Sequence, residues 1–396
     1  MTFDLPLAVT NAIDTLESAG YEAYAVGGCV RDLCRGVVPH DYDITTSATP
    51  DEIESCFTGH RIIETGIKHG TVTVIMDEMP LEITTFRTDG EYLDNRHPSS
   101  VSFSHRIGDD LSRRDFTVNA MAYSPSRGLC DPFGGREHIE SRTIACVGDP
   151  DVRFSEDGLR IMRALRFASC LGFNIDAATA GSIHKNRLLL SNISAERILS
   201  EFKRLITGDG AHDVLTGFGD VIAVIMPEVS GSGYADAVDA VSQSRCDIPL
   251  RTSLLLRSPA ALPALRRLKP DGKLLASVKC ILTLAKDGFD TDDISLRRLL
   301  RHVSYDDAVR AVEFLSARGR MGGNADTVIT RLRDMESRGE CVTPRGLAIS
   351  GHDLIALGAS EGEEVGRALE MLLEAVITGR TENEKAALIQ FYKGAS

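Results

Sequence analysis

The apolar pattern of this chain changes at about residue 155, and this change determines the expected fold class. Before that point, short runs rich in β-branched residues, such as YEAYAVG, TVTVIM and LEITTF, predict strands between helical segments. After it, apolar residues recur at helical spacing almost to the end of the chain. The sequence therefore predicts an α+β fold, with a mixed α/β head followed by an all-helical remainder.

The composition is that of an ordinary globular protein. Of the 396 residues, 43% are apolar, and 44 basic against 57 acidic side chains give a net charge of −13. No run approaches the ~18 apolar residues of a membrane span, and the first 20 residues contain no basic residue that a signal peptide would need. Nine scattered cysteines without a CxxC pair predict neither disulfides nor a zinc site. We therefore expect a cytoplasmic protein without a membrane segment.

Two carboxylates in HDYDITT form the first candidate site. Asp41 and Asp43 are two residues apart on a predicted strand, so both project from one face. Mg²⁺ prefers carboxylate and phosphate oxygens, and paired metals assist phosphoryl transfer. Glu82 alternates with Leu81 and Ile83 on another strand and could add a third carboxylate. The alternatives are a solvated strand end for the pair and an ordinary exposed strand residue for Glu82.

A glycine pair forms the second candidate. Gly27 and Gly28 stand between a predicted strand and a predicted helix. Such a turn exposes backbone N–H groups to a phosphate, with the helix dipole behind them. Arg31, one turn into the helix, could meet the same anion. A tight turn without a ligand is the alternative, but the combination with the following acidic pair is far less common by chance.

The segment RRDFTVNAMAY supplies further polar candidates beside an apolar run. Arg113 and Arg114 can neutralise the charge of a triphosphate, and Asp115 or Asn119 can hydrogen-bond a ribose hydroxyl. The alternative is a basic helix start that faces solvent.

A ladder of charged residues follows, in which Asp157, Arg160, Arg163 and Arg166 recur every three residues on one predicted helix. A salt-bridged surface is the ordinary interpretation. However, cytosine and adenine both present an amino donor beside a ring acceptor, whereas guanine and uracil present the reverse. A carboxylate beside a guanidinium therefore matches C and A alike. Asp157 and Arg160 could make this choice without a nucleic-acid template.

Taken together, these motifs resemble the class II tRNA nucleotidyltransferases. The resemblance rests on motifs in family order: GGCVRD, HDYDITTSATP, LEITTFR, RRDFTVNAMA, DPFGG, RFSEDGLRIMRALRFASCLGF and SNISAERILSEFKRL. It implies a nucleotidyltransferase head at residues 1–146 and a helical neck for base recognition at 147–208. A helical body at 209–325 and a helical tail at 326–396 would bind tRNA.

The resemblance also implies an activity and its partners. The activity is addition of C, C and A to the 3′ end of tRNA from CTP and ATP, with Mg²⁺ and release of pyrophosphate. The tRNA 3′ end and acceptor arm, CTP and ATP are the implied partners, and no protein partner is evident. Asp41 and Asp43 would hold the metals and act with Glu82 in catalysis. The implied nucleotide-binding residues are Gly28, Arg31, Arg114, Asp157, Arg160, Arg163 and Arg166. Asp115 and Asn119, proposed above from their side chains, complete the set of nucleotide-binding candidates.

Other expectations separate related functions. The loop at residues 91–103 resembles the flexible loop with which full CCA-adding members switch from C to A, and it disfavours a CC-adding enzyme. An A-adding enzyme or a poly(A) polymerase remains the alternative. An inactive RNA-binding relative would be expected to lack Asp41 or Asp43. The His-Asp pairs at 212–213 and 352–353 lack the further ligands of an HD phosphohydrolase, so none is predicted.

The segment 250–320 is basic within an acidic chain, with 14 basic and 8 acidic residues. It includes Arg297, Arg298 and Arg301, which we expect to contact tRNA phosphates.

Overall fold

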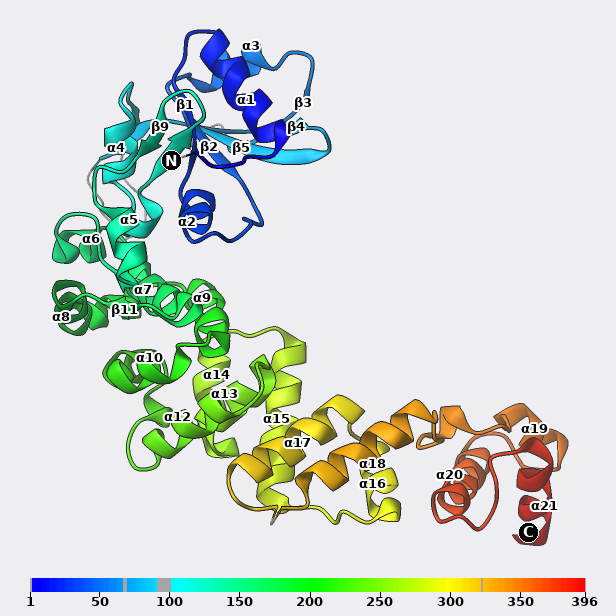
Figure 1. The fold of residues 1–396 in the computed structure, drawn as a ribbon. Coiled ribbons are helices and arrows are strands. Elements are labelled where there is room, and N and C mark those ends of the chain that lie inside the picture. The colour runs from blue at the N-terminus through cyan, green and yellow to red at the C-terminus, as the bar shows by residue number, and fades with distance from the viewer. Residues whose placement is uncertain (1, 67–69, 91–100, 322, 396) are drawn as a thin grey trace. The chain divides into compact units, whose positions relative to one another are not determined.

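In the computed structural model, which describes residues 2–66, 70–90, 101–321 and 323–395, a seven-stranded sheet forms the centre of the head (Figure 1). The strand order is β3-β4-β5-β2-β1-β8-β9, and only the β2–β5 pair is parallel. The strands are β1 (Ala23–Val26), β2 (Asp43–Thr46), β3 (Arg61–Gly66), β4 (Thr71–Met76), β5 (Met79–Thr85), β8 (Ala122–Ser124) and β9 (Gly128–Cys130). A separate antiparallel pair joins β6 (Arg87–Asp89) and β7 (Val101–Phe103).

One face of the sheet is covered by helices. Helices α1 (Leu7–Ser18) and α3 (Pro50–Cys56) pack against strands β1, β2, β4 and β5. Ile44, Leu81 and Ile83 are buried, whereas their neighbours Asp43 and Glu82 are exposed. Because successive strand residues point to opposite faces, the two carboxylates lie on the face opposite the buried core. Three further helices complete the head: α2 (Gly28–Cys34), α4 (Ile107–Ser112) and α5 (Gly135–Glu140).

Helices dominate the chain after the head. They are α6 (Pro150–Glu156), α7 (Leu159–Leu171), α8 (Ala177–Asn186), α9 (Ala195–Thr207), α10 (Ala211–Gly217) and α11 (Gly219–Ile225). Helices α7 and α9 pack together, and each is followed by a glycine, Gly172 and Gly208 respectively. Gly208 has no room for a side chain, because a Cβ atom there would lie 2.3 Å from Ser169 Oγ.

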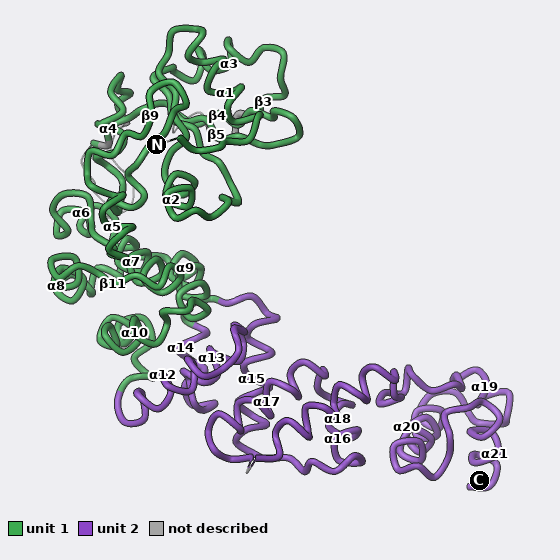
Figure 2. The backbone as a smooth tube through the Cα atoms, in the orientation of Figure 1, with its two compact units in different colours: residues 1–230, 267–269 green, residues 231–266, 270–396 purple. Residues whose placement is uncertain are grey.

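The chain divides into two compact units, coloured separately in Figure 2. Unit 1 comprises residues 1–230 and 267–269, and unit 2 comprises residues 231–266 and 270–396. The helices from residue 231 onward are α12 (Tyr234–Gln243), α13 (Ile248–Leu256), α14 (Leu262–Arg267), α15 (Gly272–Asp287), α16 (Asp293–Leu300), α17 (Tyr305–Ala317), α18 (Ala325–Ser337), α19 (Gly351–Ala356), α20 (Glu363–Ile377) and α21 (Lys385–Ala395). No strand occurs among the described residues of unit 2.

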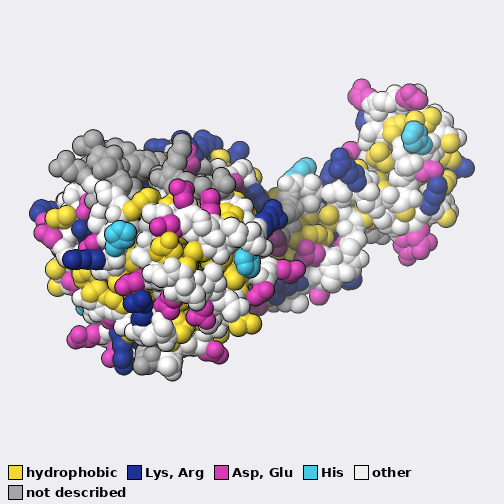
Figure 3. Space-filling view, turned by 90° about the horizontal axis from the view of Figure 1, so that it is seen from above, with side chains coloured by type: hydrophobic (Ala, Val, Ile, Leu, Met, Phe, Trp, Pro, Cys, Tyr) yellow, Lys and Arg dark blue, Asp and Glu magenta, His cyan; other side chains and the backbone are white. Residues whose placement is uncertain are grey.

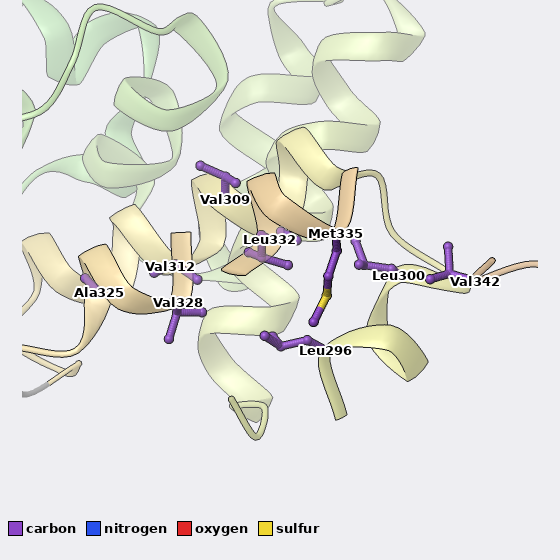
Figure 4. Close-up of a cluster of buried hydrophobic side chains, with 10 residues drawn as sticks. Leu296, Leu300, Val309, Val312, Ala325, Val328, Leu332, Met335 and Val342 are labelled. Carbon is purple, nitrogen blue, oxygen red and sulfur yellow. The ribbon is translucent and has the colours of Figure 1, made fainter. Parts of the chain in front are cut away.

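Unit 2 contains two apolar clusters toward its C-terminal end. In the first, side chains such as Leu296, Val312 and Leu332 come together from α16, α17 and α18 (Figure 4). In the second, Leu354, Leu372 and Leu388 come from α19, α20 and α21. Each helix therefore contributes one apolar stripe, as its spacing predicts.

The α+β class predicted from the sequence is confirmed, with one addition. A two-residue strand, β11 (Asn174–Ile175), lies in the helical part and pairs in parallel with β10 (Thr143–Ile144). No helix within the described ranges is long and apolar enough to cross a membrane. On the face seen in Figure 3, acidic and basic side chains are interspersed rather than gathered into one basic surface.

Candidate active site

A cavity of about 400 Å³ in unit 1 brings the sequence candidates together. It lies where the β1–α2 turn, the segment 113–119 and helices α7 and α9 meet. It is lined by Gly27, Gly28, Arg31, Asp43, Arg113, Arg114, Asp115, Asn119, Asp157, Leu159, Arg160, Arg163, Phe167 and Arg197. All of the residues expected to bind nucleotide line the cavity except Arg166. The expected catalytic residues Asp41 and Glu82 do not line it either.

The glycine turn forms one wall of the cavity. Gly27 adopts φ 80°, a left-handed conformation in which a side chain is strained. A Cβ atom on Gly27 would also lie 2.8 Å from Arg114 Nη1, so this guanidinium sits directly against the glycine backbone. Arg31 is fixed from both sides, since it donates to the Asn119 carboxamide oxygen at 2.8 Å and to both carboxylate oxygens of Asp32. The turn thus places two arginines with fixed side chains against the glycine backbone.

The acidic pair differs from the sequence expectation in one respect. Strand β2 begins at Asp43, so Asp41 precedes the strand rather than lying in it. The reason is that Val26, the last residue of β1, pairs with Asp43, and the chain then turns at Gly27. The alternation nevertheless holds, because Tyr42 is buried while Asp41 and Asp43 are exposed. The Asp41 side chain is 86% exposed and lies 2.9 Å from His40 Nδ1.

The third carboxylate comes from the neighbouring strand, as its alternation suggested. Glu82 on β5 is the direct pairing partner of Asp43 on β2. Desolvation of the carboxylate, with Glu82 and Asp41 nearby, raises the pKa of Asp43 above its usual value, although Arg114 acts in the opposite direction. Excess negative charge at this position favours a bound cation.

The donor set fits magnesium in a particular way. Among the described residues, no group of three or more His, Cys, Asp or Glu side chains could hold a metal alone. Mg²⁺, however, commonly uses one or two carboxylates and completes its shell with water and substrate phosphates. Asp41 and Asp43 fit such a partial site, which would be completed by a nucleotide.

Two arginines beside the cavity are anchored by a buried carboxylate that the sequence analysis missed. Asp110 is fully buried and accepts hydrogen bonds from Arg113 at 2.7 Å and Arg114 at 3.1 Å. Burial acts to raise the pKa of Asp110, but the guanidinium groups of Arg114 and Arg113 outweigh it and hold this pKa below its usual value. Asp110 lies on α4, three and four residues before the two arginines, and this spacing was the available signal.

Asp110→Asn should lower the free energy of unfolding by about 2 kcal/mol near neutral pH, because hydrogen bonds between charged partners are worth about 1.5–3 kcal/mol. A carboxyl whose folded pKa lies below its unfolded value of ~3.9 adds stability above that pH. It loses this contribution as the pH falls through the folded pKa. The difference from wild type should therefore shrink below about pH 4 in urea unfolding. A difference independent of pH would contradict this account, and Asp14→Asn, an exposed aspartate on α1, is the control.

The charged ladder does not lie on a single helix. Asp157 adopts an extended conformation (φ −141°, ψ 104°) between α6 and α7, and its Oδ1 accepts a hydrogen bond from Leu159 N at the start of α7. The predicted continuous helix is interrupted at Asp157, and α7 begins after Gly158, where a Cβ atom would lie 3.1 Å from the Leu189 Cβ. Asp157 is thus a capping residue of α7 that also faces the cavity.

Asp157 and Arg160 are each held by another partner. The Asp157 carboxylate accepts two hydrogen bonds from Arg197 on α9, at 2.8 and 3.4 Å. Arg160 is 9% exposed and pairs with Glu156, and it also donates to the carbonyl oxygens of Arg153 and Arg113 at 3.1 Å each. A guanidinium has five N–H groups. The described residues do not use all five N–H groups of Arg160, so this side chain can still donate to a ligand.

Arg163 closes the cavity on the side of Asp115. Its guanidinium lies 2.6 Å from the buried Asp115 carboxylate, which also accepts from Phe116 N at 2.8 Å. Burial acts to raise the pKa of Asp115, but Arg163 and Arg160 outweigh it, and the pKa lies below the usual value. Asp115 therefore stays ionised and orients Arg163.

Arg166 lies away from the cavity. Three residues advance a helix by about 300°, so the third arginine of the ladder has rotated by about 120° from the first. Arg166 pairs with Glu201 on α9 at 2.7 Å and stacks 3.6 Å from the centre of the Phe167 ring. It links α7 to α9, while Arg197 and Phe167, which the sequence analysis did not select, line the cavity.

Comparison with known proteins gives a consistent family. Residues 23–145 match the Poly A polymerase head domain family, and residues 253–392 match the tRNA nucleotidyltransferase domain 2 family. A CCA-adding enzyme of Geobacillus sp. (strain WCH70) is 36% identical, with 94% of this chain and 93% of the relative covered. The chain belongs to the CCA-adding enzyme family. The CCA-adding enzyme of Pediococcus pentosaceus is 34% identical, with 95% of each chain covered.

Solved structures agree with this family. The Bacillus stearothermophilus CCA-adding enzyme, whose crystal structure is a complex with CTP, has a TM-score of 0.82 and 32% identity and covers 98% of this chain and 96% of its own. The Thermotoga maritima CCA-adding enzyme shares the fold at 19% identity and a TM-score of 0.70, covering 98% and 95%. As a member of the CCA-adding family, the chain is a nucleotidyltransferase.

Two other sequence predictions concern residues that do not line this cavity. Residues 91–100 of the predicted switching loop are not among the described residues, and only its end, β7, is seen pairing with β6.

The three arginines expected to contact phosphates all form ion pairs within unit 2. Arg297 pairs with Glu340, Arg298 with Glu374, and Arg301 with Glu370. Their charge is therefore largely neutralised by neighbouring carboxylates.

Proposed function

We propose that this protein adds C, C and A in turn to the 3′ end of tRNA, using CTP and ATP and releasing pyrophosphate. The observation that supports it most strongly is the cavity itself. One wall carries the glycine turn and the arginines that suit a triphosphate, and the other carries Asp157 and Arg160, which suit the base edge shared by C and A. Asp43 lines the same space, so the reacting phosphate can lie between the two walls.

The carboxylates serve the transfer step in this proposal. The tRNA 3′ hydroxyl attacks the α-phosphorus of the bound nucleotide, and pyrophosphate leaves. Asp41 and Asp43 would hold magnesium, which supplies charge stabilisation at the attacking and leaving oxygens. Glu82, paired with Asp43 across the strands, would add a further negative charge beside the proposed metal site. Gly28, Arg31 and Arg114 would hold the triphosphate, which brings its α-phosphate to the carboxylates.

Nucleotide choice rests on side chains that are fixed before binding. Arg160 would donate to cytosine N3 or adenine N1, and Asp157 would accept from the exocyclic amino group. The ion pairs with Glu156 and Arg197 limit the rotation of both side chains. Rigid donors and acceptors reject UTP and GTP because a mismatch leaves buried groups unpaired. Asp115, Asn119 and Arg163 would support the sugar side, and Arg166 would support α7 from outside the cavity.

We divide the chain accordingly into a catalytic head (1–146), a base-reading neck (147–208), and a body (209–325) and tail (326–396) that bind the tRNA acceptor arm. The proposed substrates place the enzyme in the cytoplasm.

A primer assay tests the proposal. The substrates are one tRNA ending at the discriminator base, at C, or at CC, each with CTP and ATP separately and together. We expect CTP to extend the first two substrates by C only, and ATP to extend only the CC-ending tRNA. Addition of A to the CC end without any C addition would make the protein an A-adding enzyme. Long A tracts on all three ends would indicate a poly(A) polymerase.

A further inference from the structure

A second cavity, of about 440 Å³, lies wholly within unit 2. It is lined by the end of α13 and the residues that follow it, by α15 and α17, and by residue 320. Three of its lining residues are basic and none is acidic. The lining residues are Arg257, Ser258, Pro259, Ala260, Leu282, Ala285, Lys286, Phe314 and Arg320. This charge is unusual in a chain with a net charge of −13.

Arg257 adopts a conformation that arginine rarely takes. It ends α13 with φ 68°, in the left-handed region where helices commonly place glycine. Its Nη1 donates to the carbonyl oxygen of Ser232 at 2.5 Å, which holds the side chain in a defined direction. The hydrogen bond to Ser232 gives this side chain a structural role at the strained helix end.

The other two cations carry charge that the described part of the chain leaves unneutralised. Lys286, in the last turn of α15, forms no ion pair with a described residue. Arg320 donates to the carbonyl oxygen of Ala285 at 2.6 Å, a neutral partner that leaves its charge in place. The arginines of α16 differ, because each pairs with a glutamate.

The rest of the lining is apolar. Leu282, Ala285 and Phe314 are buried and form part of the wall beneath the cations. A ligand with an anionic group and a less polar body suits such a cavity, as a phosphate with its attached ribose does. Phosphate contacts by lysine and arginine supply much of the affinity of nucleic-acid complexes.

We propose that this cavity holds a backbone phosphate of the bound tRNA. The proposal rests on the proposed function, which makes tRNA the substrate, and it moves the phosphate contact from α16 to the cavity. Lys286 and Arg320 neutralise the phosphate, while Arg257 fixes the shape of the cavity edge.

The test uses the full-length protein, a tRNA lacking CCA, and Kd measured over a range of salt concentrations. The double variant Lys286→Ala/Arg320→Ala should weaken tRNA binding about tenfold and flatten the plot of log K against log salt by about 1, because one phosphate contact is lost. The matched control is Lys273→Ala/Lys279→Ala, which removes the same charge from exposed positions of α15 outside the cavity. It should change the slope much less.

Lys286→Glu provides a second variant that leaves the Arg320 hydrogen bond intact and should weaken binding at least as strongly. An equal effect of the two double variants, or no effect of either, would overturn the inference. The KM for CTP reports nucleotide binding, which is separate from the proposed phosphate contact, and it should stay at the wild-type value in all variants. Loss of nucleotide addition by the wild-type protein with intact tRNA binding would instead contradict the proposed function.

Discussion

Replacing Asp43 by alanine should slow addition of both C and A by several orders of magnitude, and Asp41→Ala should do the same. Metal ions in such a site stabilise charge that develops in the transition state, so their loss raises the barrier rather than only weakening substrate binding. Desolvation first, and then Glu82 and Asp41, raises the pKa of Asp43, and a bound cation would stabilise its ionised form. Single-turnover rates with saturating tRNA and CTP measure the effect.

The tRNA affinity and the thermal stability of both variants should stay close to wild type, since both side chains are exposed. Asp14→Ala, an exposed aspartate on the far helix α1, is the control and should keep full activity. Variant rates within about tenfold of wild type, or roughly 1.4 kcal/mol of barrier, would remove both aspartates from the proposed metal site.

Arg160→Ala should reduce the preference for CTP and ATP over UTP and GTP while leaving the triphosphate wall intact. Each lost hydrogen bond to the base should be worth about 1–3 kcal/mol. Asp157→Ala should also reduce the preference for CTP and ATP, since it removes the acceptor for the exocyclic amino group. The measurement is relative kcat/KM for the four nucleotides on a CC-ending and a discriminator-ending tRNA.

Arg166→Ala is the matched control, because it removes an arginine from the same helix that is also ion-paired but lies outside the cavity. It should lower stability through the lost link to Glu201 and leave nucleotide preference unchanged. Unchanged preference in both Arg160→Ala and Asp157→Ala would mean that these residues form only a salt-bridged face.

Part of this site could be predicted from the sequence because it depends on local periodicity. The two-residue alternation of strands places Asp43 and Glu82 on one face, and the structure pairs them directly. The glycine pair predicted the turn at Gly27, whose left-handed φ and contact with Arg114 require glycine.

Other parts depend on contacts between distant segments, which local periodicity does not report. The extended backbone of Asp157 interrupts the helix that the spacing predicted, and its carboxylate instead accepts a hydrogen bond from Leu159 N at the start of α7. Arg197 reaches the cavity only because α9 packs on α7. The composition of the segment 250–320 likewise indicated a basic surface, but acidic residues far along the chain, such as Glu374, neutralise its α16 arginines.

The most direct test of the account is to sequence the 3′ ends made from a tRNA that ends at the discriminator base, with all four nucleoside triphosphates present. No template is available in this reaction, so the order of bases must come from the protein. The account predicts ends that read CCA and stop there, with U and G rare. Ends that carry A alone, long A tracts, or mixtures of all four bases would contradict it.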